Sequence, residues 1–391
     1  MSVPLLRVGL LGCGTVGAHV VRLLAEHASD IERRSGCRIE VARIAVRDPD
    51  RERGVAVPPE RFITEPHEVV KDPQVDIVVE LMGGVDPARE LLLAAFAAEK
   101  PVVTANKELL ANHGRELFDA AERAKVDLSF EAAVGGGIPL IHPLKESLAG
   151  ERLRRVMGIV NGTTNYVLTR MTDEGLTFAE ALAEAERLGY AEADPSADIE
   201  GQDAAAKCAI LASIAFNARV VAADVYREGI GGVTTDDIAF AERLGYVVKL
   251  LAVAEVEDGE VAVRVHPAMI PRDHPLAAAR GSMNAVFVEG ENVGELMFLG
   301  SGAGGAPTAT AVVGDIVDVA RNLVHGGRGV GCTCYEERRI RPMEQMEGQY
   351  YLLLEVADRP GVLAQIAGVF GEQGVSIKSV WQEGTGEEAR L

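Results

Sequence analysis

The sequence predicts an α/β protein with an N-terminal doubly wound parallel sheet, an α+β domain and a small C-terminal β-α-β unit. Its 391 residues are too many for one compact core. Strand-like and helical segments alternate up to about residue 131, and the alternation ends at Gly135-Gly136-Gly137. We therefore expect a first domain at 1–135, completed by residues of about 300–325, a second domain at 136–300, a linker at 326–347 and a last unit at 348–391.

Short patterns predict the elements of the first domain. The apolar run 5–11 leads into a glycine-rich turn, which is typical of a buried strand followed by a helix. The run 75–80 is apolar throughout, as in a parallel strand that helices cover on both faces. The other expected elements are helices at 16–29, 86–99 and 107–125, and strands at 39–47, 101–104 and 126–131.

The later parts of the chain mix helical and strand-like patterns without regular alternation. In the second domain we expect helices at 138–148, 177–188 and 202–216, strands at 153–160, 247–256, 261–270 and 284–289, and a helix at 307–324 that returns to the first domain. In the last unit we expect a strand at 349–356, a helix that opens near Gly361 and a strand at 375–380.

Charge and composition exclude several classes of partner. The net charge is −20, so nucleic acid and anionic membrane surfaces are not expected partners. The apolar N-terminal stretch is broken by glycines and Arg7, unlike a signal peptide, and the other apolar runs are too short to cross a bilayer. The cysteines are few, odd in number and without metal-ligand spacing, so we expect reduced thiols in a cytoplasmic protein; they are Cys13, Cys37, Cys208, Cys332 and Cys334.

The turn Gly12-Cys13-Gly14-Thr15-Val16-Gly17 predicts a dinucleotide site. Gly12 permits a tight turn, Gly14 leaves room for a pyrophosphate, and Gly17 lets the helix pack on the strand. The amides of Thr15 and Val16, at the start of that helix, point at the phosphates. Such a motif alone is weak, but its place between a strand and a helix in an alternating series is the context that supports it.

Arg47 stands near the end of the second expected strand, where an acidic residue usually binds the ribose 2′-hydroxyl of NAD. An arginine there suits a 2′-phosphate and favours NADP, whereas the neighbouring Asp48 keeps NAD possible. A solvated charged loop without a ligand explains the same residues equally well.

Two groups of residues carry candidate catalytic chemistry. Lys107 follows a strand at the carboxyl edge of the parallel sheet, where such sheets bind ligands. Asp203 and Lys207 are four residues apart on one helix face, which fits a general acid/base pair but also an ordinary surface ion pair.

At this point the sequence resembles the homoserine dehydrogenase family over nearly its whole length. That family interconverts L-homoserine and L-aspartate 4-semialdehyde on the route to threonine, methionine and isoleucine, so the resemblance implies an NAD(P)-dependent oxidoreductase. The motifs that carry the resemblance are the glycine turn, Thr104-Ala105-Asn106-Lys107, Glu131-Ala132-Ala133-Val134-Gly135-Gly136-Gly137-Ile138-Pro139, Asn161-Gly162-Thr163-Thr164-Asn165-Tyr166, the segment 192–207 and Ser301-Gly302-Ala303-Gly304-Gly305.

The resemblance also implies roles for single residues. Lys207 resembles the proton donor to the aldehyde oxygen, and Lys107 a second catalytic lysine near substrate and nicotinamide. Glu192 resembles the carboxylate that binds the substrate ammonium, with Asp198 and Asp203 in the same pocket. Gly302 resembles a cofactor contact, and the family implies a homodimer or homotetramer. The backbone at four positions resembles a sodium site: Glu131, Val134, Gly136 and Ile138.

The chemistry of the residues fits these roles. Hydride transfer to an aldehyde builds negative charge on oxygen, which an ammonium can stabilise and protonate. Asp203 would favour the charged form of Lys207, whereas oxidation needs the neutral amine and should rise with pH. The glycines 135–137 fit a carbonyl cage for a hard cation, or a mere hinge.

Two other functions are compatible with parts of the sequence. An acylating semialdehyde dehydrogenase needs a nucleophilic cysteine, but Cys208 is more simply a packed core residue. A non-catalytic amino-acid sensor could keep the dinucleotide fold, but it would have no need for both lysines and the pocket carboxylates.

The last unit resembles the first half of an ACT domain, a ferredoxin-like module that often binds an amino acid. The motif Asp358-Arg359-Pro360-Gly361-Val362-Leu363 and the run 375–380 carry this resemblance. Only β-α-β precedes Leu391, so we expect a partial unit with an unpaired strand edge and weak or no inhibition by threonine.

Overall fold

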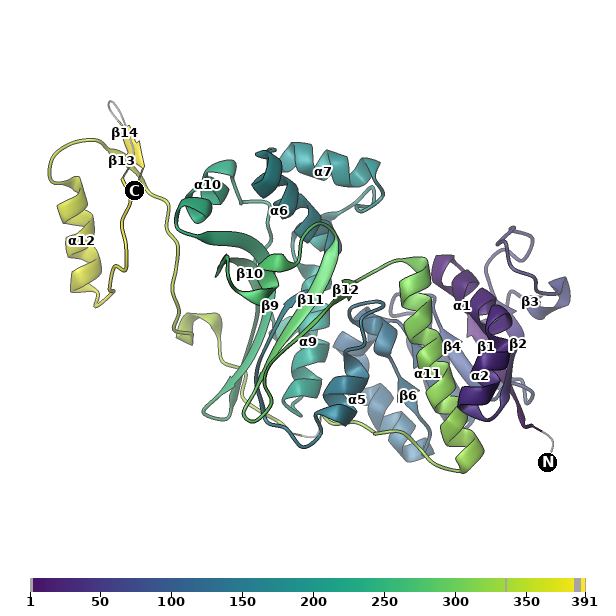
Figure 1. Cartoon of the computed structure of the whole chain (residues 1–391). Coiled ribbons are helices and arrows are strands. Elements are labelled where there is room, and N and C mark those ends of the chain that lie inside the picture. Colours follow the sequence, from purple (N-terminus) through teal and green to yellow (C-terminus); the bar gives the residue numbers. More distant parts are fainter. Residues whose placement is uncertain (1–2, 335, 383–387, 391) are drawn as a thin grey trace. The chain divides into compact units, whose positions relative to one another are not determined.

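The computed structural model describes residues 3–334, 336–382 and 388–390. It divides into two units, Met1–Glu344 and Gln345–Leu391, which are described separately. Among the described helices, none is long and apolar enough to cross a membrane. Figure 1 shows the whole chain with many of its elements labelled.

The first sheet of the larger unit is parallel and has the strand order β3-β2-β1-β4-β5-β6. The chain moves from β1 to β2 and β3 on one side, then crosses to β4 on the other side of β1. The expected doubly wound sheet is thereby confirmed, and its switch point lies between β1 and β4. The strands are β1 (Leu5–Leu11), β2 (Arg38–Ala45), β3 (Phe62–Ile63), β4 (Ile77–Glu80), β5 (Val102–Thr104) and β6 (Leu128–Ser129).

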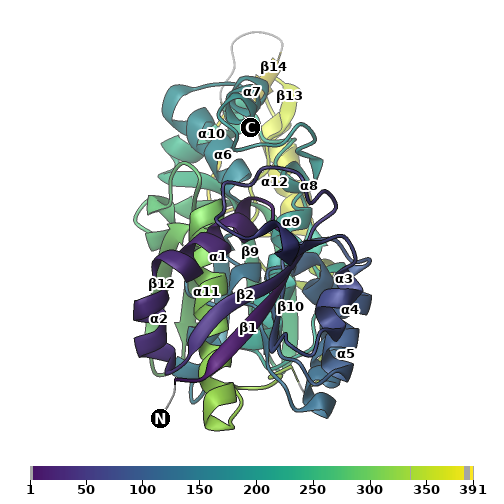
Figure 2. The same cartoon turned by 90° about the vertical axis from the view of Figure 1, so that its right-hand side faces the viewer.

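Helices cover both faces of this sheet, as Figure 2 shows from the side of β1 and β2. On one face lie α1 (Thr15–Glu26), α2 (Ala28–Ser35) and the late helix α11 (Gly305–His325), which packs on α1. On the other lie α3 (Pro66–Lys71), α4 (Ala88–Ala97) and α5 (Lys107–Ala124). The helix expected at 16–29 is therefore two helices, separated at His27.

The second sheet is mixed and has the order β12-β11-β7-β9-β10-β8. Its strands are β7 (Leu153–Ile159), β8 (Tyr226–Arg227), β9 (Tyr246–Glu257), β10 (Glu260–Pro271), β11 (Met283–Gly290) and β12 (Gly294–Ser301). Its helices are α6 (Gly162–Glu174), α7 (Phe178–Arg187), α8 (Ser196–Ile199), α9 (Gln202–Ala215) and α10 (Thr235–Arg243). The sequence patterns missed α6, α8, α10, β8 and β12.

Helix α9 links the two halves of the larger unit, because it packs on β9 and β10 and also on α5. Nearly every residue from Ala204 to Ala215 is buried, and many of them are alanines. Small side chains let the surrounding strands and helices approach α9 closely. This contact with α5 brings the residues of the second half near the carboxyl edge of the first sheet.

The helix expected at 138–148 does not form over that range. The chain turns through Gly135 and Gly136, both with positive φ, and only a short helical stretch follows, with a π-helical turn at Pro143–Ser147. The carboxylate of Glu131 accepts hydrogen bonds from the backbone amides of Leu140, Ile141 and His142. These bonds satisfy the free amides at the start of the helix, which therefore begins later than its apolar residues suggest.

In the smaller unit the expected strands 349–356 and 375–380 are largely wrong. The unit contains α12 (Val362–Glu372) and an antiparallel pair of β13 (Glu355–Ala357) and β14 (Glu388–Arg390). Apolar side chains in the expected strands remain half exposed, among them Leu352 at 54% and Val375 at 51%. A period-two pattern predicts a strand only when a neighbouring strand supplies the hydrogen bonds.

Candidate active site

The glycine turn joins β1 to α1 at the switch point of the first sheet. Gly12 has φ +97°, and a Cβ atom there would lie 2.9 Å from the carbonyl oxygen of Leu81. A Cβ atom on Gly17 would lie 2.6 Å from the oxygen of Gly12, so these two glycines are required by the fold. Gly14 is exposed, and a Cβ atom there would meet open space. The turn therefore leaves free the position at which a pyrophosphate would approach the start of α1.

The residues that follow β2 form a basic loop beside this turn. Arg47 is exposed two positions beyond the end of β2. The carboxylate of Asp48 accepts the amide of Asp50, so Asp48 is engaged within its own loop. Arg53, which the sequence analysis missed, donates to the carbonyl oxygen of Cys13 at 3.2 Å and lies over the ring of Phe62. Its signal in the sequence was the series of arginines at 47, 51 and 53.

A second unpredicted residue, Glu80, organises the carboxyl ends of β4 and β5. Its side chain is fully buried and accepts the amides of Met82 and Gly83 at 2.7 and 3.0 Å. The hydroxyl of Thr104 donates to its other oxygen at 2.7 Å. A buried carboxylate without a cation is stable when several donors surround it. The only hint in the sequence was an acid at the end of an apolar strand.

Asp203 brings the two candidate lysines together. Its Oδ1 lies 3.1 Å from Nζ of Lys107, at the start of α5, and its Oδ2 accepts from Nζ of Lys207 at 2.7 Å. Lys207 also donates to the carbonyl oxygen of Val160 at 2.7 Å. The Lys207 residue is only 9% exposed, so its ion pair with Asp203 is not the surface pair that the spacing also allowed.

The charges in this cluster act on Asp203. Burial alone would raise the pKa of its carboxyl, but Lys207 and Lys107 outweigh burial and hold that pKa well below the usual range. Asp203 is therefore an anion throughout the neutral range. It neutralises one positive charge while its two oxygens orient two ammonium groups.

Asn161 and Thr163 extend the cluster to Asp198. The side-chain amide of Asn161 donates to Asp198 at 2.7 Å and to Asp203 at 2.9 Å, while its oxygen caps α6 by accepting the amide of Thr164. The hydroxyl of Thr163 is 2.9 Å from Asp198 and 2.7 Å from the carbonyl oxygen of Tyr190. Both residues lie in a motif that the sequence singled out without giving them a role; an asparagine before a helix was the available signal.

Glu192 lies apart from these bonds, exposed in the turn between α7 and α8. The turn is nevertheless tied to the cluster, because the carbonyl oxygen of Tyr190 accepts from Thr163. The structure thus brings Lys107, Asp198, Asp203 and Lys207 together and leaves Glu192 at the rim.

The expected sodium positions and Gly302 lie where the second sheet returns to the first. Gly136 has φ +55°, and a Cβ atom there would lie 2.5 Å from the carbonyl oxygen of Gly302. Val134 and Ile138 are buried. Further along, Gly305 packs against Thr15 and His19, so the start of α11 lies against the start of α1.

The structure shows which cysteines are free and whether Cys208 could act as a nucleophile. Cys332 and Cys334 form a disulfide, so the expectation of five reduced thiols is wrong, and only Cys13, Cys37 and Cys208 are free. Two cysteines separated by one residue in an extended segment can reach each other, with Cα atoms 5.6 Å apart. Cys208 is fully buried, which raises the pKa of its thiol to about 12, so it is no nucleophile.

Comparison with known families and structures matches almost the whole chain. The family profile described as homoserine dehydrogenase matches residues 139–317, and that of the homoserine dehydrogenase NAD binding domain matches residues 12–131. An ACT domain profile matches residues 350–391.

Individual relatives give the same result. The homoserine dehydrogenase of Corynebacterium glutamicum is 52% identical over 390 residues, which are 98% of this chain and 87% of that protein. The crystal structure of a homoserine dehydrogenase from Thiobacillus denitrificans has a TM-score of 0.94 and 45% identity, covering 99% of this chain and 90% of that one. A hyperthermophilic archaeal homoserine dehydrogenase in complex with NADPH has a TM-score of 0.68 and 28% identity, covering 83% of this chain and 99% of that one.

Proposed function

This chain belongs to the homoserine dehydrogenase family, and we propose that Lys107, Asp203 and Lys207 form the centre at which it acts. It is an oxidoreductase that interconverts L-homoserine and L-aspartate 4-semialdehyde with a nicotinamide dinucleotide, on the route to threonine, methionine and isoleucine. The observation that carries the proposal is the single carboxylate of Asp203 between two lysines that come from different halves of the unit.

Lys207 exchanges the proton of the reacting oxygen. In the oxidation of homoserine its neutral amine accepts the hydroxyl proton, and in the reduction its ammonium donates a proton to the aldehyde oxygen. A bound nicotinamide dinucleotide supplies the hydride acceptor or donor. The carbonyl oxygen of Val160 and the carboxylate of Asp203 fix the position of Nζ, which keeps the proton path short.

Lys107 and the carboxylates position the substrate. The side chain of Lys107 is 43% exposed, so it can turn from Asp203 to the substrate. Glu192 is exposed and can approach the substrate ammonium from the rim. Asp198 is already held by Asn161 and Thr163, which fix its side chain beside the substrate.

For the cofactor we propose NADP rather than NAD. The room beside Gly14, the amides of Thr15 and Val16 at the start of α1 and the return of the chain near Gly302 fit the pyrophosphate half of a dinucleotide. Arg47 and Arg53 place two guanidinium groups in the loop that follows β2, where a 2′-phosphate is bound in this fold.

The sodium site also stays a proposal, with Glu131, Val134, Gly136 and Ile138 as its backbone ligands. Its support is the tight turn at Gly135 and Gly136, which can direct several carbonyl oxygens at one point. The carboxylate of Glu131 is occupied by three amides, so only its backbone oxygen could take part.

We further propose domains at 1–135 with about 300–325, 136–300 and 348–391, and a homodimer or homotetramer. The outer strand of the second sheet supports self-association, because it presents apolar side chains to solvent, with Leu299 at 51% exposure. Analytical ultracentrifugation of the purified chain tests this: a monomer at micromolar concentration would contradict it.

A direct assay tests the proposed chemistry. The purified protein is mixed with L-homoserine and NADP, and formation of NADPH is followed by its absorbance. We expect turnover with NADP and L-homoserine and less with NAD. If phosphate must be added and an acyl phosphate forms, the acylating reaction is correct instead; if nothing turns over in either direction, the catalytic assignment fails.

A further inference from the structure

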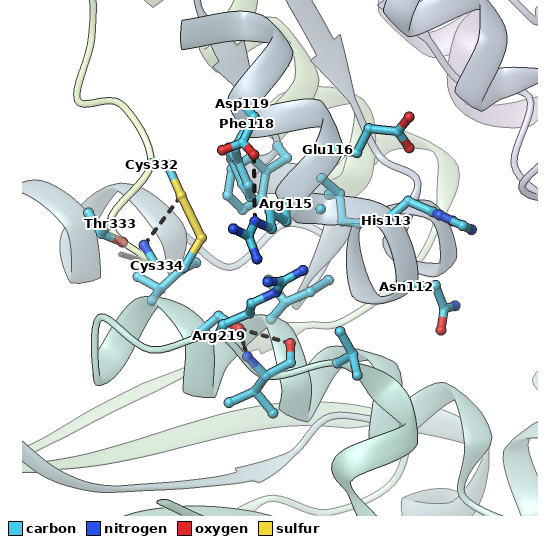
Figure 3. A pocket seen from close by; sticks show the side chains of 18 of the residues that line it. Asn112, His113, Arg115, Glu116, Phe118, Asp119, Arg219, Cys332, Thr333 and Cys334 are labelled. Atoms are coloured by element: carbon cyan, nitrogen blue, oxygen red, sulfur yellow. Dashed lines mark hydrogen bonds and ion pairs between the residues drawn. A yellow bond between two sulfur atoms is a disulfide. The ribbon is translucent and has the colours of Figure 1, made fainter. Parts of the chain in front are cut away.

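A cavity of about 370 Å³ lies between α5, α9 and the segment that contains the Cys332–Cys334 disulfide (Figure 3). Its volume falls in the range of sites for small organic molecules, which is roughly 300–1,000 Å³. Much of its wall is apolar, formed by Leu110, Phe118, Phe130, Ile210, Ile214 and Val220. It lies within the larger unit and includes neither Lys107 nor Lys207.

Two arginines give this cavity a positive charge. The side chains of Arg115, from α5, and Arg219, from the loop after α9, point toward one another in Figure 3. Guanidinium groups in such an arrangement repel each other unless an anion lies between them. Because the chain as a whole has a net charge of −20, this local pair of arginines is a candidate binding site for an anion.

The cavity's own acids do not supply that anion. Glu116 is held by Arg89 through two hydrogen bonds of 2.6 and 2.7 Å. Asp119 lies one helical turn from Arg115 and approaches it only to 3.6 Å. Among the described residues neither of these two acids forms an ion pair with Arg219, so neither bridges the two guanidinium groups.

The carboxylate of Glu337 lies near both guanidinium groups but forms no hydrogen bond with either of them. Oε1 of Glu337 lies 3.6 Å from Arg115 and 3.9 Å from Arg219, beyond hydrogen-bond distance from both. The Glu337 side chain is 82% exposed. Its backbone neighbour Glu336 is tied to Asn217 and Arg219 by main-chain hydrogen bonds, which keep Glu337 near the cavity. Exposed pairs of this kind contribute about 0–1 kcal/mol, so a ligand carboxylate can replace Glu337.

We propose that this cavity binds a small organic monocarboxylate with an apolar body. The ligand carboxylate takes the place of Glu337 between Arg115 and Arg219, where it can form bidentate hydrogen bonds. Its body lies against the apolar wall near Phe118 and Phe130, whose rings are 5.5 Å apart. The Cys332–Cys334 disulfide closes one side of the site.

Benzoate is the test ligand, and benzamide is its uncharged counterpart. Isothermal titration calorimetry is performed on the full chain without reductant, cofactor or substrate, so the result does not depend on the proposed catalysis. We expect benzoate but not benzamide to bind. Arg115→Gln and Arg219→Gln should each weaken benzoate binding by a factor of about ten, equivalent to the loss of a charged hydrogen bond. Arg34→Gln, on the exposed part of α2, is the matched control and should leave binding unchanged.

Glu337→Gln distinguishes this site from any other basic patch. Because it removes the competing carboxylate, it should strengthen benzoate binding severalfold. Because its side chain is exposed, the substitution should leave the fold intact. The proposal is overturned if benzoate does not bind at millimolar concentration, if benzamide binds equally, if Glu337→Gln weakens binding, or if saturating L-homoserine with NADP displaces benzoate.

Discussion

Oδ1 of Asp203 lies 3.1 Å from Nζ of Lys107, although the two residues belong to helices in different halves of the unit. The second oxygen of Asp203 binds Lys207, one turn further along α9. A single buried carboxylate therefore sets the position of both ammonium groups. Since burial and two cations act on one side chain, its charge should be essential to the site.

Asp203→Asn keeps the shape of this side chain and removes its charge. We expect kcat for homoserine oxidation to fall by a factor of about 10² to 10⁴, because Lys207 loses its orienting anion. Binding of NADP, followed by quenching of protein fluorescence, should change little. A variant that retains more than a third of the normal kcat would show that Asp203 is not needed to position the lysines.

Arg47→Ala tests the choice of cofactor. If Arg47 binds the 2′-phosphate, KM for NADP should rise by a factor of about ten, which corresponds to the loss of a charge-assisted hydrogen bond. KM for NAD should stay the same, and Arg53→Ala should act in the same direction. An equal rise for both cofactors would point to a general distortion of the loop, and no change would favour NAD.

Glu80→Gln probes how the carboxyl edge of the first sheet is held. The substitution replaces a carboxyl group whose two oxygens accept three hydrogen bonds by an amide, which has only one oxygen to accept them. We expect the loop at Met82 and Gly83 to loosen, KM for the cofactor to rise severalfold and kcat at saturation to change less. The steady-state constants check this split, and a pure loss of kcat would contradict the positioning role.

His142 should make stability depend on pH. The hydrogen bond to Asp315, against the opposing effect of burial, raises the pKa of His142 to about 9. Because this pKa lies above that of the unfolded chain, His142 stabilises the fold fully below about pH 6.5 and loses this contribution as the pH rises to 9. A shift of this size is worth at most about 3 kcal/mol. Solvent reduces that value, since the side chain is 32% exposed.

The matching experiment compares the wild-type chain with His142→Gln by urea denaturation. The difference in unfolding free energy should be largest at pH 6 and should diminish towards pH 9. Using the difference cancels the titration of groups that do not contact His142. The carboxylates that face it contribute to the difference, Asp315 above all, since burial raises its pKa to about 6; the others are Glu131, Glu146 and Asp318. A difference that grows with pH would have the wrong sign for this ion pair.

Much of the fold was predictable because it rests on local patterns. The bounds of β1 agree with the expected 5–11, and the separate roles of Gly12, Gly14 and Gly17 follow from turn geometry. The i,i+4 spacing of Asp203 and Lys207 predicted their contact but not their burial. Burial depends on which strands pack around α9, and no local pattern encodes that.

The remaining errors involve partners distant in the sequence. Glu131 caps a helix nine to eleven residues later, so the apolar residues alone placed that helix too early. The strands expected at 349–356 and 375–380 have the right residue types, but a strand needs a pairing edge. The Cys332–Cys334 disulfide could not be deduced from the spacing of the two cysteines, which is compatible with two free thiols as well.

The central claim is that Lys207 exchanges the proton during hydride transfer. Stopped-flow absorbance of Lys207→Ala, with L-homoserine and NADP at saturation, measures this step directly. Lys71→Ala, an exposed lysine on α3, is the matched control. We predict that Lys207→Ala slows NADPH formation by a factor of at least about 10² while Lys71→Ala has no effect. Formation of NADPH at the normal rate by a folded Lys207→Ala protein would contradict the account.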